Sequence, residues 1–203
     1  VKNPVAMLML KDDSSVAKTF TGSTDIDYRF HFLPELRAHL GLGLDLSDGQ
    51  QDLYIDKANS DSHPHGREGW ETVFKTNKSL NYYMQYINNI GDMHNFDVMA
   101  GYEWQHFYRE GNNYYIGLDG YLPQEREWKS ENYLVSFFGR FNYNLANKYL
   151  FTATVRNDGS SRFASEHRWG IFPSFAFAWK VSEEGFMKSQ RLFSDLKLRL
   201  GYG

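Results

Sequence analysis

The chain has 203 residues, a formal net charge of -3 and no cysteine, and 17% of its residues are aromatic. The lack of cysteine excludes disulfides, thiol nucleophiles and thiolate metal sites, and the near-balanced charge without a basic block gives no reason to expect nucleic acid as a partner. No run of about 18 apolar residues occurs, which excludes a transmembrane helix but not a membrane β-barrel, whose strands alternate lipid-facing with polar residues.

The N-terminal residues are not expected to form a signal peptide. Residues 3–10 are predicted to form a short extended segment, closed by a turn-forming run from Asp12 to Ser15. The apolar run at residues 5–10 is too short for a signal peptide, and an acidic pair follows it. The chain begins with valine and ends within a predicted strand, so we expect a fragment of a longer protein.

Strict alternation of apolar and polar residues dominates the rest of the chain. In residues 36–47, for example, every even position from Leu36 to Leu46 carries leucine or alanine. A helix would scatter these leucines around its circumference, so the alternation predicts β-strands. The predicted strands are residues 18–32, 36–47, 70–86, 96–108, 133–145, 149–156, 169–181 and 195–203.

The predicted connections alternate in length. The short ones are residues 33–35, 88–95 and 144–147, and the long ones are residues 48–69, 111–129 and 158–168. The connection at residues 182–194 breaks the trend, because it is long but falls on the short side. Short periplasmic turns opposite long extracellular loops are typical of a bacterial outer-membrane barrel.

The same alternation also fits a soluble barrel or sandwich whose apolar face turns inward, and that alternative stays open. Long strands and aromatic residues near strand ends on the apolar face favour the membrane interpretation. The candidate girdle residues are Tyr133, Tyr143, Tyr149, Trp169 and Trp179.

Charged residues gather on the polar face. They are Arg37, Asp45, Asp97, Glu103, Arg109, Arg140, Arg156, Lys180 and Arg199. A charge on a lipid face costs roughly 2–4 kcal/mol at the midplane, so these residues are predicted to face the lumen. We expect most of them to pair along the barrel wall and a minority to contact substrate.

Four aromatic residues in the long predicted loop at residues 111–129 are the candidate substrate contacts: Tyr114, Tyr115, Tyr121 and Trp128. Aromatic planes suit stacking on sugar rings, and loops carry function more often than the elements they connect. The alternative is that these rings pack on one another.

Other motifs give weaker signals. The run from Asp158 to Arg162 lacks the following helix of a phosphate cradle, so we expect a connector in which Gly159 allows a tight turn and Arg162 pairs with Asp158 or loop carbonyls. His63 and His65 with Glu68 have ligand-like spacing but no third fixed position, so no metal is expected there.

Two further patterns argue against a metal and against catalysis. Asp48, Asp52 and Asp56 lack the glycine and bidentate glutamate of a calcium loop, so a polar loop is the better interpretation. No Ser/His/Asp set or paired carboxylates stand out, and we expect no enzyme and no cofactor.

Residues 152–163 (TATVRNDGSSRF), followed by residues 169–174 (WGIFPS) and residues 179–184 (WKVSEE), resemble the SusC/RagA family of TonB-linked outer-membrane transporters. Residues 3–6, 133–143 and 196–199 are similar to that family as well. The pieces occur in the family's order and spacing across essentially the whole chain, most specifically over residues 131–203.

The resemblance implies an all-β fold of long antiparallel up-and-down strands, forming part of a large transmembrane outer-membrane β-barrel of about 22 strands. Residues 1–203 would be one partial barrel domain of about eight or nine strands, without plug, TonB box or the rest of the barrel. It also implies import of glycans or peptides. The implied partners are a SusD-like surface lipoprotein, the TonB complex through the missing N-terminal part, and outer-membrane lipid.

Overall fold

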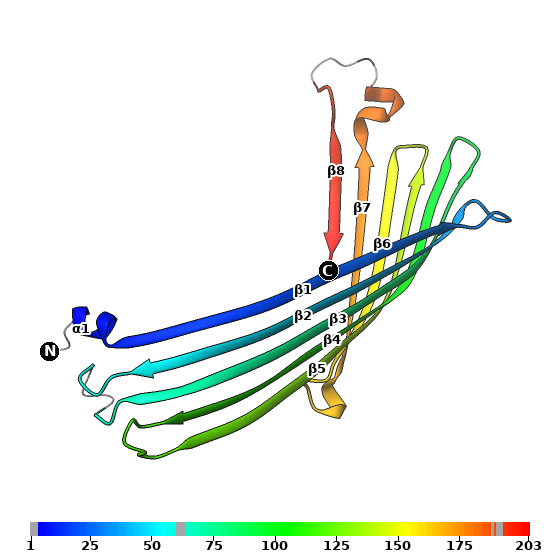
Figure 1. Cartoon of the computed structure of the whole chain (residues 1–203). Coiled ribbons are helices and arrows are strands. Elements are labelled where there is room, and N and C mark those ends of the chain that lie inside the picture. Colours follow the sequence, from blue (N-terminus) through cyan, green and yellow to red (C-terminus); the bar gives the residue numbers. More distant parts are fainter. Residues whose placement is uncertain (1–3, 60–63, 188, 190–192) are drawn as a thin grey trace. The chain divides into compact units, whose positions relative to one another are not determined.

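The computed structural model describes residues 4–59, 64–187, 189 and 193–203. Eight strands form one sheet in which neighbours in sequence are neighbours in space (Figure 1). They are β1 (Lys11–Arg29), β2 (Leu36–Ile55), β3 (Arg67–Ile90), β4 (His94–Ile116), β5 (Gln124–Leu145), β6 (Tyr149–Ser160), β7 (Trp169–Lys180) and β8 (Lys197–Tyr202). This order confirms the predicted all-β fold of antiparallel up-and-down strands.

The chain comprises two compact units. Unit 1 contains Val1–Gly22, Gly43–Lys78 and His106–Asn132, and unit 2 contains Ser23–Leu42, Ser79–Gln105 and Tyr133–Gly203. Strands β1 to β5 contribute residues to both units, whereas β6, β7 and β8 belong to unit 2.

One face of unit 2, here the apolar face, is a surface of contacting aromatic rings. Phe137 lies 5.1 Å from the ring of Tyr102 and 6.1 Å from that of Trp169, and Phe151 lies 4.8 Å from Phe177. No second layer covers these rings, since Ile55 is the one buried apolar residue in the described part of the chain. A sandwich or soluble barrel would bury this face, so the structure contradicts that alternative.

The opposite face of unit 2, here the polar face, carries a chain of hydrogen bonds across five strands. Arg37 on β2 donates to Gln85 on β3 (2.7 Å), and Gln85 donates to Asp97 on β4 (2.7 Å). Asn142 on β5 donates to Asp97 (3.4 Å) and accepts from Thr152 on β6 (2.9 Å). Side chains that alternate along each strand meet their cross-strand neighbours, so the ladder register places these groups in contact.

A second polar cluster supports the expected charge pairing. The guanidinium of Arg156 bonds to Glu103 and to Asp158, and it lies 5.8 Å from the ring of Phe138. Asp45, in unit 1, accepts hydrogen bonds from Thr21 and Asn77.

The strands of unit 1 extend further than the sequence predicts. The connections between them shorten to residues 56–66 and 117–123, against predicted loops at residues 48–69 and 111–129. Apolar alternation marks a strand only where its two faces meet different surroundings, and a strand with water on both faces keeps its ladder without that pattern. For the same reason Tyr133 lies inside β5 and not near a strand end, and its role as a girdle residue stays a prediction.

The N-terminal segment was also predicted wrongly. Residues Pro4–Met9 form the short helix α1 instead of an extended segment, with proline in its first turn, where its missing N–H costs nothing. Within the described residues, no helix is long and apolar enough to cross a membrane.

Two details of the β6–β7 connection differ from expectation. Gly159 lies inside β6, where an added Cβ would sit 2.9 Å from the ring of Trp169, its partner on β7. The glycine therefore makes room for a large ring and does not form a turn. Asp158 pairs with Arg156, two residues before it on the same strand, and the connection itself contains the short 3-10 helix Ser165–His167.

A glutamate fastens the connection after β7 to the strand ends. Glu184 follows the 3-10 helix Val181–Glu183 and accepts from Lys148 Nζ (2.8 Å), from the Tyr149 hydroxyl (2.6 Å) and from Trp179 Nε1 (3.2 Å). These donors, Lys148 first, lower the pKa of Glu184 from 4.5 to about 2. Three donors on one carboxylate stabilise its ionised form, which explains the direction of the shift.

The 203-residue chain by itself is expected to aggregate in detergent-free buffer. Its aromatic face is uncovered, and β1 and β8 each have only one neighbouring strand in the described sheet, so their outer edges offer unpaired backbone groups. Size-exclusion chromatography with light scattering measures this. A monodisperse monomer without detergent would contradict it.

The substitution Glu184→Gln is expected to loosen residues 181–187 without changing the sheet. The ionised carboxylate holds the segment at pH above about 4.5, and this contribution is lost as pH falls toward 2, because the depressed pKa means that protonation breaks the contacts. Hydrogen exchange of this segment in the detergent-solubilised full-length protein should rise at neutral pH. Glu183→Gln, one residue earlier, is the matched control and should leave exchange unchanged.

Candidate functional site

Two connections of unit 1 meet through their backbones. The N–H of Leu118, in residues 117–123, donates to the carbonyl of His65, in residues 56–66 (3.0 Å). Gly66 beside it has a φ of +65°, and an added Cβ would lie 2.6 Å from Leu118 Cδ1. Only glycine combines this left-handed conformation with so close an approach, so Gly66 fixes how the two connections join.

A histidine–aspartate pair closes the same junction. His65 Nδ1 lies 2.7 Å from Asp119 Oδ2, and the His65 ring stacks on Tyr121 with centroids 4.0 Å apart and planes 17° apart. Asp119 also accepts from the N–H of Tyr121 (3.2 Å) and lies 3.7 Å from Lys57 Nζ. The hydrogen bond from His65 is the largest of the effects that lower the pKa of Asp119, so its carboxylate is ionised at neutral pH.

An open cavity of about 360 Å³, here the rim cavity, lies at the junction. It is lined by Pro64, His65, Gly66, Arg67, Tyr115, Ile116, Gly117, Tyr121, Leu122 and Gln124. Its volume lies at the lower end of the range for small-ligand sites.

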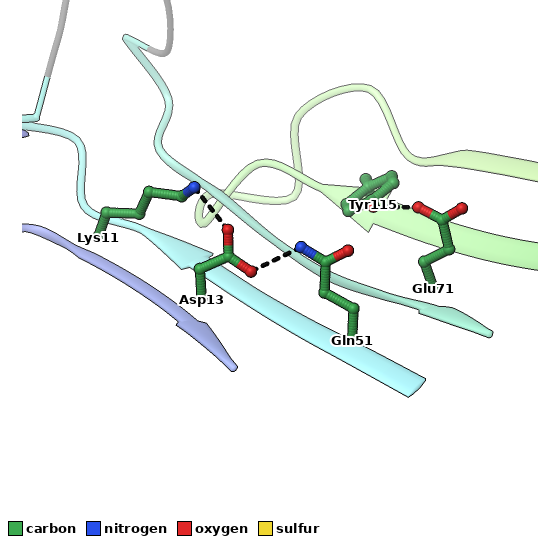
Figure 2. Close-up of polar contacts among 5 residues, drawn as sticks. All are labelled: Lys11, Asp13, Gln51, Glu71 and Tyr115. Carbon is green, nitrogen blue, oxygen red and sulfur yellow. Dashed lines mark hydrogen bonds and ion pairs between the residues drawn. The ribbon is translucent and has the colours of Figure 1, made fainter. Parts of the chain in front are cut away.

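Tyr115 occupies the polar side of unit 1. Its hydroxyl donates to Glu71 Oε2 (3.4 Å), near the group in which Lys11 and Gln51 both donate to Asp13 (2.6 Å each), as Figure 2 shows. The guanidinium of Arg67 lies over the Tyr115 ring, 4.0 Å from its centroid. Arg67 and Tyr115 both line the rim cavity, so a guanidinium lying over an aromatic ring forms part of its wall.

Trp128 lies in a separate cavity of about 510 Å³, beside Glu110, Gly111 and Lys129. The guanidinium of Arg109 lies 5.0 Å from the centre of the Trp128 ring.

Tyr114 points away from Tyr115, because consecutive strand residues face opposite sides of a sheet. It lines a third cavity, of about 410 Å³, with Tyr54 and Trp70. Three carboxylates, those of Asp12, Asp52 and Glu68, also border that space.

The sequence profile of the family described as TonB dependent receptor-like, beta-barrel, matches residues 10–203. The chain belongs to this family. It is 45% identical to the TonB-dependent receptor SusC of Bacteroides thetaiotaomicron over 210 residues, which cover 100% of this chain and 21% of that protein. It is 31% identical to the TonB-dependent receptor P26 of Formosa agariphila over 224 residues, with coverages of 99% and 22%.

The chain therefore spans about a fifth of the length of these TonB-dependent receptors. Its fold matches solved structures of the RagAB peptide importer in the closed-closed state (TM-score 0.82, 21% identity) and of the RagAB peptide transporter (TM-score 0.81, 22% identity). Each match covers 95% of this chain and 23% of the other. At this identity the likeness shows the fold alone.

Membership of the TonB-dependent receptors confirms the SusC/RagA resemblance and the outer-membrane location. The uncovered apolar face of unit 2 is accordingly the lipid-facing one, since only the hydrocarbon of the bilayer offers an apolar surrounding for it.

The four candidate contacts of this TonB-dependent receptor segment are not one site. Tyr115 and Tyr121 line the rim cavity, whereas Trp128 and Tyr114 each line another space. Only Tyr121 lies in a connection, because β4 and β5 extend over the other three. Their role in binding cargo stays a prediction.

Sequence reasoning missed Arg67 and Asp119 as members of this site. The sequence pointed to Tyr115 and Tyr121 as substrate contacts and to His65 only through a metal hypothesis with His63 and Glu68, of which His63 lies outside the described residues. Within the described residues no group of three or more His, Cys, Asp or Glu side chains is arranged to hold a metal. A pairing across residues 65 and 119 leaves no local signal in the sequence, apart from the two glycines, Gly66 and Gly120, whose positive φ marks the bends.

Asp119→Asn is expected to open the rim cavity locally. The change removes the charge that holds His65 and Lys57, so amide exchange in residues 117–123 should rise at neutral pH in the full-length receptor. In the unsubstituted protein the same opening should appear only as pH falls below the ordinary carboxyl pKa of 3.8, since the depressed pKa keeps Asp119 ionised above it. Asp92→Asn, in the turn at residues 91–93, is the control. Equal exchange of residues 117–123 in the two variants would refute the role of Asp119 in holding His65 and Lys57.

Proposed function

We propose that this chain is part of the wall of a TonB-dependent outer-membrane transporter that imports glycans. The observation that carries the proposal is the 45% identity to the receptor SusC over the whole chain. The polar network inside unit 2 and the uncovered rings on its other face suit a wall between a wet lumen and lipid. In this proposal residues 1–203 are one partial β-barrel domain, and the plug and the TonB box belong to other parts of the protein.

The proposed partners follow from the same family membership. A SusD-like surface lipoprotein would deliver the cargo, and the TonB complex would supply the energy through the N-terminal part of the protein. Oligosaccharide is the proposed cargo, and peptide is the other class that the test includes. The proposal contains no catalytic step.

The rim cavity is the proposed cargo contact within this segment. Tyr121 keeps one ring face against His65 while its side chain remains 51% exposed, so the other face is open to a ligand. The apolar C–H face of a sugar ring packs on such an aromatic surface, and the hydroxyls stay hydrogen-bonded at the edges. Trp128 and Tyr114 are proposed as further contacts in their own cavities.

Uptake by the full-length transporter tests the proposal. A strain lacking the gene should lose growth on the cargo glycan, and the unsubstituted gene should restore it. Tyr121→Ala and Tyr115→Ala should each weaken oligosaccharide binding by roughly fivefold to tenfold, the effect of removing an aromatic contact from a binding site.

Phe20→Ala is the control for these variants. Phe20 is an exposed aromatic residue of the same unit that lines none of the three cavities, and its loss should leave binding unchanged. If the gene is needed for growth on peptides and not on glycans, the cargo is peptide and the proposed glycan cargo is wrong. A gene deletion without any uptake defect would overturn the transport function itself.

A further inference from the structure

Arg67 is a half-buried cation that has no anionic partner among the described residues. Its guanidinium covers the Tyr115 ring at 4.0 Å, and no carboxylate in the described part of the chain forms an ion pair with it. Arginine offers five N–H donors in a rigid plane that matches a carboxylate or sulfate with two parallel hydrogen bonds. A half-buried guanidinium that has no ion-pair or hydrogen-bond partner among the described residues can bind an anion.

The neighbouring carboxylates are already engaged. Asp119 is held by His65 and Lys57, and Glu71 accepts from the hydroxyl of Tyr115. The rim cavity thus presents Arg67 as its free cation among the described residues, with Tyr121 as the exposed ring on the same cavity wall.

We propose that the rim cavity selects acidic saccharides, with Arg67 pairing the carboxylate or sulfate of a sugar whose ring packs against Tyr121. This deepens the proposed glycan transport and rests on it. Contact with the Tyr115 ring restrains the Arg67 side chain before a ligand arrives, so less side-chain freedom is lost on binding. The volume of about 360 Å³ lies at the lower end of the range for small-ligand sites, which suits a short stretch of a saccharide.

The competing interpretation is that Arg67 only covers Tyr115. A cation–π contact of this kind stabilises a surface without any ligand. The two interpretations differ in what the arginine does to discrimination between ligands, because a covering role affects neutral and acidic saccharides equally.

Binding measurements on the purified full-length receptor separate them. The probes are a neutral oligosaccharide, the matching oligomer with a uronate, the matching oligomer with a sulfate ester, and an acidic peptide. The receptor should bind the acidic oligomers roughly tenfold to a hundredfold more tightly than the neutral one, the range of a hydrogen-bonded charge pair. Comparison of the uronate and sulfate oligomers identifies which anion the receptor prefers. The preference for acidic over neutral oligomers should weaken as the salt concentration is raised.

The variants assign that preference to one side chain. Arg67→Met keeps the length of the side chain and should abolish the preference while leaving the neutral affinity unchanged. Arg67→Lys keeps the charge but not the planar fork of donors, so it should retain part of the preference for acidic oligomers. Arg126→Met is the control, because Arg126 is an exposed arginine of unit 1 that lines none of the three cavities.

Three results would overturn the inference. Equal affinity of the unsubstituted receptor for neutral and acidic oligomers does so without any variant, and so does an Arg67→Met effect that is the same for both. Binding of the acidic peptide in place of the saccharides overturns it as well. If no saccharide binds and no glycan supports growth, both the acid selectivity and the proposed glycan cargo are refuted. Glycan uptake without a preference for acidic saccharides refutes the selectivity alone.

Discussion

The antiparallel backbone ladder is the interaction on which every other feature of this chain depends. It pairs each strand with its neighbour in sequence from β1 to β8, and so satisfies backbone N–H and C=O groups that neither lipid nor a buried wall could satisfy. Because the ladder fixes the register, it also decides which side chains meet. Phe141, Ala153 and Phe175 line up across three strands on one face, and Asn142, Thr152 and Ala176 line up beside them on the other.

The two faces are stabilised in different ways. The lipid-facing side of unit 2 gains nothing from burial within the protein and relies on contacts between rings, such as Phe151 with Phe177. The polar side uses the chain of hydrogen bonds from Arg37 to Thr152 and the pairing of Arg156 with Glu103. A charge without partners inside a barrel wall is costly, so these residues are joined across strands rather than left to solvate separately.

In unit 1 the same ladder supports a contact between two connections. Its strands run on until residues 56–66 and 117–123 meet, and the contact is made by one glycine, one histidine and one aspartate. The rim cavity exists because Gly66 lets Leu118 approach and because Asp119 holds His65 against Tyr121. The shape of the rim cavity therefore depends on the contacts of Gly66, His65 and Asp119 as well as on Arg67 and Tyr115, which line the same cavity.

The sequence by itself determined the fold class, the strand order and the two-faced character of the wall, because a period of two is a local property of each strand. It also determined the family, through residues 152–163 and the motifs that follow them in order. Only the tertiary structure decided where the strands of unit 1 end, that Gly159 accommodates Trp169, and that Tyr114 and Tyr115 belong to different surfaces. It alone brought His65 to Asp119 and left Arg67 over Tyr115. Such pairings join residues that are distant in the chain, so no local pattern encodes them. A strand with similar surroundings on both faces lacks the alternation of apolar and polar residues from which a sequence predicts a strand.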